Sequence, residues 1–276
     1  MSLMFIFISI KMTSFDEKIF NAVSDMANIA NNPFKDKWVS ILGDSISTFA
    51  NYIPEENTTY YPAGDVNLEF KTWWHILLTK LGAKLCVNNS YGGRKVCGDA
   101  DADVKNAVNK LHRVAGQKYI NLDGKYETAT EDVQPDIILV LLGTNDFNAG
   151  VTLGSLEMKY LGTSNFTTDF YKSYNCLLVS LIINYPKTQI YCLDGIYDGN
   201  FNFIGTNSAG NRQPEFINAI IEIAKFTTVH CLHPYNICVT DVTKDEYMID
   251  KLHPNAKMMK MIANQCYREM LANNCL

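Results

Sequence analysis

The segment at residues 136–142, which is apolar without interruption from residue 137 onward, constrains the fold of this chain more than any other feature of the sequence. After Pro135 and Asp136 it reads Ile-Ile-Leu-Val-Leu-Leu, without the alternation of polar and apolar side chains that a half-exposed strand shows. A strand that is apolar on both sides is typical of a parallel sheet covered by helices on both faces. The run therefore predicts a buried strand in an α/β protein.

Strand patterns and helix patterns alternate along the rest of the chain. Short β-prone runs predict strands at residues 38–42, 84–88, 136–142, 189–193 and 229–232. Apolar side chains spaced three and four residues apart predict helices at residues 70–81, 101–114, 170–181, 214–226 and 254–271. Because strand and helix alternate about five times, we expect a three-layer α/β/α sandwich with a parallel sheet of about five strands, joined by right-handed crossovers.

Two segments between these elements carry weaker patterns. Residues 48–67 contain Pro54, Pro62 and Gly64 without an apolar period, so we expect a long loop there. Residues 117–133 indicate no clear element, although the Asn-Leu-Asp-Gly phrase at residues 121–124 is compatible with a hairpin turn. The prediction of a parallel sheet therefore depends on the other segments.

No linker or change in composition divides the chain into separate folding units. We expect one domain over residues 36–276, preceded by an N-terminal extension over residues 1–35 that is helical and packs on or beside the domain. Residues 4–10 are apolar, but they are too few to span a bilayer and lack the basic segment and cleavage site of an export signal. We expect no membrane span, with the remnant of an export signal as the alternative.

The composition of the chain limits which classes of molecule it is expected to bind and which cellular compartment it is expected to occupy. A net charge of −5 with scattered lysines and arginines argues against a nucleic-acid-binding surface. The eight cysteines include no C-x-x-C pair, and several lie in apolar patterns, so a reducing, cytoplasmic location is expected, with export as the alternative. His230 and His233 flank Cys231, which we interpret as a strand end rather than a zinc site. We expect no metal and no cofactor, and the sequence predicts no particular oligomeric state.

Three short phrases lie where the loops of such a sheet would meet. Ser45 ends a Gly-Asp-Ser phrase after the first predicted strand, Asn145 lies in a Gly-Thr-Asn-Asp phrase after the third, and Asp250 and His253 precede the closing helix. The loops at the carboxyl ends of parallel strands gather at one rim of the sheet. We therefore expect these residues, together with Gly93 after the second strand, to lie close together.

The side chains in these phrases are the parts that a serine hydrolase requires. A serine hydroxyl needs a base within hydrogen-bond reach, and the base needs a group that fixes its tautomer. His253, with Asp250 three residues before it, supplies this pair for Ser45. The oxyanion that forms on an attacked ester needs donors, for which the backbone N–H groups of Ser45 and Gly93 and the Asn145 amide are candidates. Each phrase alone also fits ordinary turn or cap chemistry, but their order and placement favour catalysis.

Three residues near these phrases are interpreted as structural. Asp44 and Asp146 each lie beside a candidate catalytic residue, yet an aspartate at a helix start is commonly a cap or a loop brace. Trp74 lies at helical spacing among apolar residues and is expected in the core. None of the three is counted among the catalytic residues.

The chain resembles the SGNH/GDSL hydrolases over residues 38–271. The resemblance lies in Ile-Leu-Gly-Asp-Ser-Ile at residues 41–46, Asn-Asn-Ser-Tyr-Gly-Gly at 88–93, Gly-Thr-Asn-Asp at 143–146 and Asp-x-x-His-Pro at 250–254. It implies a flavodoxin-like sandwich and esterase or lipase activity on small acyl groups. It also implies that the nucleophile is Ser45, the base and its orienting carboxylate His253 and Asp250, and the oxyanion donors Gly93 and Asn145.

Two positions depart from the family pattern. Ile46 replaces the leucine of the family name with a side chain of similar volume, which should matter little. Gly92 and Gly93 are adjacent, so either could supply the backbone N–H that binds the oxyanion. We prefer Gly93, because the family pattern places this donor five positions after Asn88. Neither departure removes a catalytic part.

The polar loop at residues 48–67 favours a small, polar substrate. Candidate substrate-binding residues are Tyr60, Tyr61, Tyr91 and Arg94, because tyrosine rings can stack on a sugar. We expect a serine esterase that hydrolyses small O-acyl esters, acetyl esters of carbohydrates above all, through an acyl-serine intermediate. The alternatives are a lysophospholipase or thioesterase of the same fold, and a non-catalytic carbohydrate-binding protein on an inherited hydrolase fold. Transfer of the acyl group to an acceptor other than water also stays open.

Overall fold

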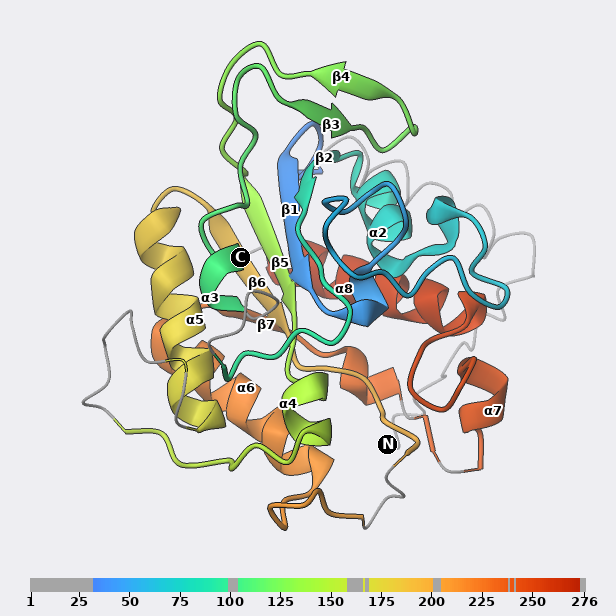
Figure 1. Cartoon of the computed structure of the whole chain (residues 1–276), viewed down its shortest axis with the longest axis vertical. Helices are drawn as coiled ribbons and strands as arrows, with labels where there is room; N and C mark the ends of the chain where they lie inside the picture. The colour runs from blue at the N-terminus through green and yellow to red at the C-terminus, as the bar shows by residue number, and fades with distance from the viewer. Residues whose placement is uncertain are drawn as a thin grey trace, which may run out of the picture.

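Five parallel strands form the central sheet of this computed structural model (Figure 1), which describes residues 32–98, 104–157, 166, 169–200, 205–237, 239–240 and 242–273. The strands are β1 (Trp38–Gly43), β2 (Lys84–Asn88), β5 (Ile137–Leu141), β6 (Gln189–Leu193) and β7 (His230–Leu232). Their order across the sheet is β2-β1-β5-β6-β7, and every neighbouring pair is parallel. The predicted parallel sheet is confirmed. Most of the predicted N-terminal extension, residues 1–31, lies outside the described residues.

Helices cover both faces of the sheet (Figure 1). The longer helices are α2 (Trp73–Leu81) and α8 (Ala256–Asn273) on one face, and α5 (Phe170–Asn184) and α6 (Gln213–Thr227) on the other. Neighbouring side chains of β5 pack on opposite faces of the sheet. Leu139 lies in the apolar cluster with α2 and α8, and Val140 lies in the apolar cluster with α5 and α6. The apolar run that predicted this strand is therefore buried on both sides, and the three-layer sandwich is confirmed.

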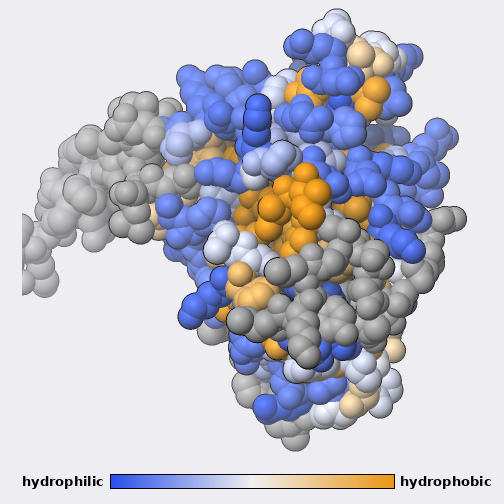
Figure 2. Space-filling view, turned by 90° about the vertical axis from the view of Figure 1, so that its left-hand side faces the viewer, coloured by the Kyte–Doolittle hydropathy of each residue, from blue (hydrophilic) through white to orange (hydrophobic). Residues whose placement is uncertain are grey.

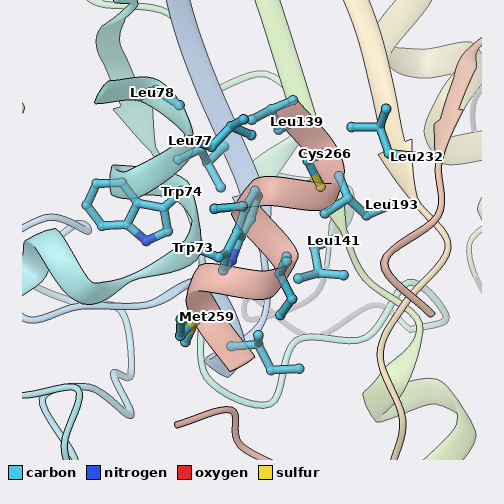
Figure 3. Close-up of a cluster of buried hydrophobic side chains, with 14 of the residues drawn as sticks. Trp73, Trp74, Leu77, Leu78, Leu139, Leu141, Leu193, Leu232, Met259 and Cys266 are labelled. Carbon is cyan, nitrogen blue, oxygen red and sulfur yellow. The ribbon is translucent and has the colours of Figure 1, made fainter. Parts of the chain in front are cut away.

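The core on the α2 and α8 face is built from side chains of several elements (Figure 3). Trp73 and Trp74 of α2 and Met259 of α8 are fully buried there, so the expected core position of Trp74 is confirmed. Full burial of a large apolar side chain stabilises the folded state by about 1.5–3 kcal/mol. Figure 3 shows this cluster meeting the sheet through Leu139, Leu141, Leu193 and Leu232.

Two predicted helices differ from the observed elements by more than a shift of their ends. The helix predicted at residues 70–81 begins at Trp73, because Thr72 is extended and caps α2; the residues before it form a separate 3-10 turn, η2 (Glu69–Lys71). The helix predicted at residues 101–114 is observed as α3 (Val104–Ala107), with residues 101–103 outside the described part. The prediction of helix up to residue 114 is wrong, because the Arg113 backbone pairs with Val133 instead.

A two-stranded hairpin fills the segment that had no clear sequence pattern. Its strands are β3 (Lys118–Ile120) and β4 (Tyr126–Thr128), with the turn at residues 121–125. Because the chain passes from β4 directly into β5, the hairpin lies beyond the amino ends of the strands (Figure 1). Arg113 links the hairpin to the sheet edge: its guanidinium pairs with the Glu127 carboxylate of β4 and donates to the Leu85 carbonyl at 2.7 Å and the Cys86 carbonyl at 2.8 Å.

Short elements complete the described chain and lie between the longer ones. They are η1 (Ser45–Ser47), α4 (Thr144–Asn148), η3 (Pro234–Ile237) and α7 (Lys244–Tyr247). On the face that carries α5, Figure 2 shows an apolar area within a mostly hydrophilic surface, and Ile182 and Ile183 of α5 are exposed large apolar side chains. Within the described residues, no helix has both the length and the apolar character needed to cross a membrane.

Candidate active site

Ser45 lies in a tight turn directly after β1. It begins η1, and the carboxylate of Asp44 caps this turn by accepting the Ile46 N–H at 3.0 Å. Gly43 lets the chain pack this closely, because a Cβ there would lie 2.5 Å from Ser47 Oγ. The turn thus presents the Ser45 hydroxyl at the carboxyl end of β1, as the sequence predicts.

His253 and Asp250 meet Ser45 from the other end of the chain. The Nε2 atom of His253 lies 2.9 Å from Ser45 Oγ, although 208 positions separate the two residues. The Nδ1 atom of His253 lies 2.8 Å from Asp250 Oδ2. A carboxylate accepts hydrogen bonds only, so His253 carries its proton on Nδ1 and offers Nε2 as an acceptor to the serine hydroxyl.

The turn between Asp250 and His253 holds the carboxylate in place. Asp250 Oδ1 accepts the backbone N–H of His253 at 2.8 Å and that of Leu252 at 3.2 Å. Burial on its own would raise the pKa of Asp250, but hydrogen bonds from the His253 backbone, Tyr60 and the His253 ring outweigh it and lower the pKa to about 2. The carboxylate is therefore ionised throughout the neutral and mildly acidic range.

Burial has the opposite consequence for the imidazole. The His253 side chain is 11% exposed, and burial lowers its pKa below the ordinary 6.5, although the nearby Asp250 and Asp198 carboxylates oppose the shift. The imidazole is therefore neutral at neutral pH. A neutral ring hydrogen-bonded to a serine hydroxyl can accept the hydroxyl proton.

Asn145 lies on the same rim, in α4 directly after β5. Its Nδ2 donates to the Arg94 carbonyl at 3.1 Å and lies 3.4 Å from Asp44 Oδ2. Both neighbours are acceptors, so they fix which end of the amide carries the hydrogens. The NH₂ group of the Asn145 side chain thus faces the loop that contains Gly93.

The two glycines of the second block differ in what their backbone does. Gly92 donates its N–H to the Thr58 carbonyl at 2.7 Å, so this donor is already used. Gly93 is exposed, has a φ of +82°, and has no atom within 4 Å of where a Cβ would be. Its left-handed conformation favours glycine. The geometry therefore leaves Gly93 as the more accessible of the two.

Asp44 and Asp146 are fully buried and brace loops, in agreement with their structural interpretation. Asp146 accepts the backbone N–H groups of Val96 and Cys97 at 2.9 and 2.7 Å, which holds the loop that follows Gly93. Burial raises the pKa of Asp146 to about 6 and that of Asp44 to about 7. Both carboxylates therefore support the geometry of the rim.

The four candidate substrate-binding residues separate into two groups. Tyr60 and Tyr91 are partly exposed, whereas Tyr61 is fully buried and Arg94 is 2% exposed. The Tyr61 hydroxyl donates to the Pro254 carbonyl at 2.7 Å, and the Arg94 guanidinium donates to the Asn89 carbonyl. The prediction of substrate contact is therefore corrected for Tyr61 and Arg94, because their polar groups bind the protein's own backbone.

Asp198 is a residue near the site that the sequence reasoning missed. It lies on the loop after β6, is fully buried, and accepts the Asn200 N–H at 2.9 Å. The next residue, Gly199, donates to the Lys251 carbonyl at 2.8 Å, so this loop packs on the turn that holds Asp250 and His253. The rule that loops at the carboxyl ends of parallel strands gather at one rim also applies to β6 and was a usable signal. Among the described residues, no group of three metal-binding side chains occurs.

The sequence profile of the GDSL-like lipase/acylhydrolase family matches residues 37–270. The chain belongs to this family. It is accordingly a serine hydrolase that acts on ester bonds, and the resemblance found in the sequence blocks is confirmed. A search of curated protein sequences finds no match.

Solved structures share the fold over most of their length. A proposed GDSL-like lipase from Bacteroides ovatus is 26% identical, with a TM-score of 0.60, over 87% of this chain and 99% of that chain. A proposed GDSL-like lipase from Bacteroides uniformis is also 26% identical, with a TM-score of 0.60, over 84% and 94%. A catalytic mutant of an acetylxylan esterase from Geobacillus stearothermophilus is 14% identical, with a TM-score of 0.53, over 87% and 96%. At that identity the esterase shares the fold alone.

Proposed function

We propose that this GDSL-family hydrolase removes small acyl groups, acetyl above all, from carbohydrate esters through an acyl-Ser45 intermediate. The observation that carries the proposal is the chain of hydrogen bonds from Ser45 Oγ to His253 Nε2 at 2.9 Å and from His253 Nδ1 to Asp250 Oδ2 at 2.8 Å. This arrangement is the one that turns a serine hydroxyl into a nucleophile.

In the first half of the reaction, Ser45 Oγ attacks the ester carbonyl carbon while His253 Nε2 takes its proton. The resulting imidazolium is stabilised by the ionised Asp250, whose low pKa keeps it a carboxylate. When the carbon–oxygen bond to the alcohol breaks, His253 returns the proton to the leaving alcohol. In the second half, His253 activates a water that attacks the acyl carbon and releases the acid and Ser45.

The proposed oxyanion donors are the backbone N–H groups of Ser45 and Gly93 and the side-chain amide of Asn145. One hydrogen of the Asn145 amide is held by the Arg94 carbonyl at 3.1 Å, and the other is directed toward Asp44 at the longer distance of 3.4 Å. The longer contact is the weaker one. We infer that an oxyanion replaces Asp44 as the acceptor, because a developing negative charge is a stronger acceptor than a distant carboxylate oxygen.

The exposed surface of the loop at residues 48–67 supports a small, polar substrate. The large apolar side chains of this loop are directed into the core: Tyr52, Ile53, Tyr61 and Val66 are all buried. Polar residues remain at its surface, among them Thr58 and Thr59. A site for long acyl chains needs a lining of exposed apolar side chains, which this loop does not supply.

A chain-length series of p-nitrophenyl esters tests the proposed acyl preference. We expect kcat/KM to be highest for the acetate and to fall from butyrate to octanoate and longer chains. Acetylated xylan oligosaccharides, with released acetate as the readout, test the alcohol part. A maximum at long acyl chains would instead support the lysophospholipase or thioesterase alternative. Labelling of Ser45 by a fluorophosphonate, located by peptide mass spectrometry, checks the nucleophile independently of substrate choice.

The pH dependence follows from the neutral state of His253. The base must be unprotonated, so kcat/KM falls as the pH drops through the pKa of His253. Burial lowers this pKa below 6.5, so we expect the midpoint of the acidic limb to lie below pH 6.5. The measurement is kcat/KM for p-nitrophenyl acetate across the acidic range, read at a wavelength where both forms of p-nitrophenol absorb equally. A midpoint above 6.5 would contradict the buried, neutral base.

A further inference from the structure

One side chain touches both members of the Asp250–His253 pair. The Tyr60 hydroxyl donates to Asp250 Oδ2 at 2.7 Å. The Tyr60 ring also lies flat on the His253 ring, with centroids 3.4 Å apart and planes 9° from parallel. A residue placed only to bind substrate would not need both contacts.

The hydroxyl contact restrains a carboxylate that is partly open to solvent. The Asp250 side chain is 43% exposed. Its hydrogen bonds with His253 and Leu252 come from its own turn, whereas Tyr60, 190 positions away, binds it from another segment of the described chain. Burial and the Asp250 bond both raise the pKa of Tyr60, so its hydroxyl remains a donor wherever the enzyme works. Charge-assisted bonds of this kind are stronger than neutral ones.

The ring contact restrains the imidazole in a different way. A flat stack fixes the plane of the His253 ring and shields one of its faces from water. The plane determines whether Nε2 is directed at Ser45 Oγ, which lies 2.9 Å away. The ring stack of Tyr60 therefore orients His253 for proton transfer from Ser45, and the Tyr60 hydroxyl holds the Asp250 carboxylate that binds the other side of the His253 ring.

Tyr60 is itself fixed to the turn that holds the nucleophile. Its backbone N–H donates to Thr48 Oγ1 at 2.9 Å, and the Thr48 hydroxyl donates to the Ser45 carbonyl at 2.8 Å. The adjacent Tyr61 anchors the other side, because its hydroxyl binds the Pro254 carbonyl next to His253. The segment at residues 48–61 thus joins the Ser45 turn to the His253 turn.

We propose that Tyr60 is a positioning residue that holds the carboxylate of Asp250 and the ring of His253 in the geometry that Ser45 needs. This inference rests on the proposed roles of Ser45, Asp250 and His253. This role differs from substrate binding, for which the sequence makes Tyr60 a candidate. A pocket wall would affect KM, whereas a positioning residue affects kcat and the titration of the base.

The Tyr60→Phe variant separates these roles, because it keeps the ring and removes only the hydroxyl. We expect kcat to fall by roughly five- to tenfold with KM unchanged, as for loss of a hydrogen bond to a charged group at a partly exposed site. The pKa of His253 should rise: without the phenol donor, Asp250 concentrates more negative charge on the imidazolium. The other groups that face His253, Asp198 and Asp250, are unchanged in this variant. A Tyr60→Leu variant, which also loses the stack, should lower kcat further, by about 10²-fold.

Tyr171→Phe is a matched control. The Tyr171 hydroxyl binds the Glu222 carboxylate at the same 2.7 Å, but between α5 and α6 on the other side of the sheet. This variant should leave kcat and the pH profile unchanged. Thermal melting of all variants shows whether each is folded.

Titration of the His253 ring by NMR gives a readout that does not depend on turnover. Its resonance is assigned by its loss in a His253→Asn variant. A higher pKa in Tyr60→Phe than in the unmodified protein, with Tyr171→Phe unchanged, supports the proposal. An unchanged His253 titration, or a raised KM with kcat intact, overturns it. Failure of a fluorophosphonate to label the unmodified protein would remove the proposed function instead, and the NMR comparison would still report on Tyr60.

Discussion

The Ser45→Ala variant is expected to hydrolyse p-nitrophenyl acetate with a kcat/KM roughly 10⁴-fold or more below that of the unmodified protein. The substitution removes the atom that attacks the ester and that holds His253 Nε2 at 2.9 Å. Folding should persist, because Ser45 lies in a short turn whose cap is made by Asp44 and the Ile46 backbone. The measurements are steady-state kinetics, thermal melting and fluorophosphonate labelling, which should be absent in this variant.

Ser47 offers a matched control in the same turn. It is fully buried, and its hydroxyl accepts the indole N–H of Trp73 at 3.2 Å. Ser47→Ala leaves that N–H without its partner, which costs about 1–3 kcal/mol and lowers the melting temperature. It should still be labelled at Ser45. Turnover by Ser45→Ala close to that of the unmodified protein would show that another residue carries the acyl group.

The sheet was predictable because its strands are apolar on both faces. The boundaries of β2 and β6 agree with the sequence prediction, and β5 differs by one residue at each end. Burial on both faces leaves a local signal in each strand that depends on no distant partner. The strand–helix alternation then predicts the layers.

The hairpin and the end of α3 were not predictable, because distant contacts determine them. Tyr126 in β4 is 62% exposed, so this strand carries no buried face and no apolar pattern. After α3 ends at Ala107, the Leu111 N–H donates to the Tyr185 hydroxyl, and Arg113 binds the carbonyls of β2 and pairs its backbone with Val133. The spacing of residues within one short segment does not indicate which distant residues that segment will contact.

In the candidate site, too, the residues expected to take part in the reaction were easier to predict than the residues that hold them in place. Ser45, Asn145, Asp250 and His253 were predicted as site residues because their side-chain types fit one reaction and their phrases lie at the predicted rim. The residues that hold them gave weaker signals. Tyr60 was identified for its place in a polar loop, but its contacts with Asp250 and His253 depend on how segments 190 positions apart meet.

The Asp250→Asn variant is expected to show whether Asp250 sets the tautomer of His253, the proposed base for Ser45. The Oδ1 atom of Asp250 accepts two backbone N–H groups, from Leu252 and His253, which can only donate. An asparagine must therefore place its carbonyl oxygen at the Oδ1 position and its NH₂ group at the Oδ2 position. Tyr60 tolerates this exchange, because a hydroxyl that donates to Oδ2 can rotate and accept instead.

His253 does not tolerate the exchange. Its Nδ1 lies 2.8 Å from Oδ2 and 3.0 Å from Oδ1, so the NH₂ group at the Oδ2 position would be its nearer neighbour. We expect Nδ1 to accept from this NH₂ group, which moves the ring proton to Nε2. An Nε2–H group donates to Ser45 Oγ and cannot take its proton. We expect kcat to fall by roughly 10³- to 10⁴-fold with little change in folding, because the wrong tautomer is held in the right place. Asp65→Asn is the control: Asp65 also accepts a backbone N–H, from Ala256 at 2.9 Å, and an amide oxygen can replace it. If Asp250→Asn retained a kcat close to that of Asp65→Asn, Asp250 would not be the group that sets the tautomer of the base.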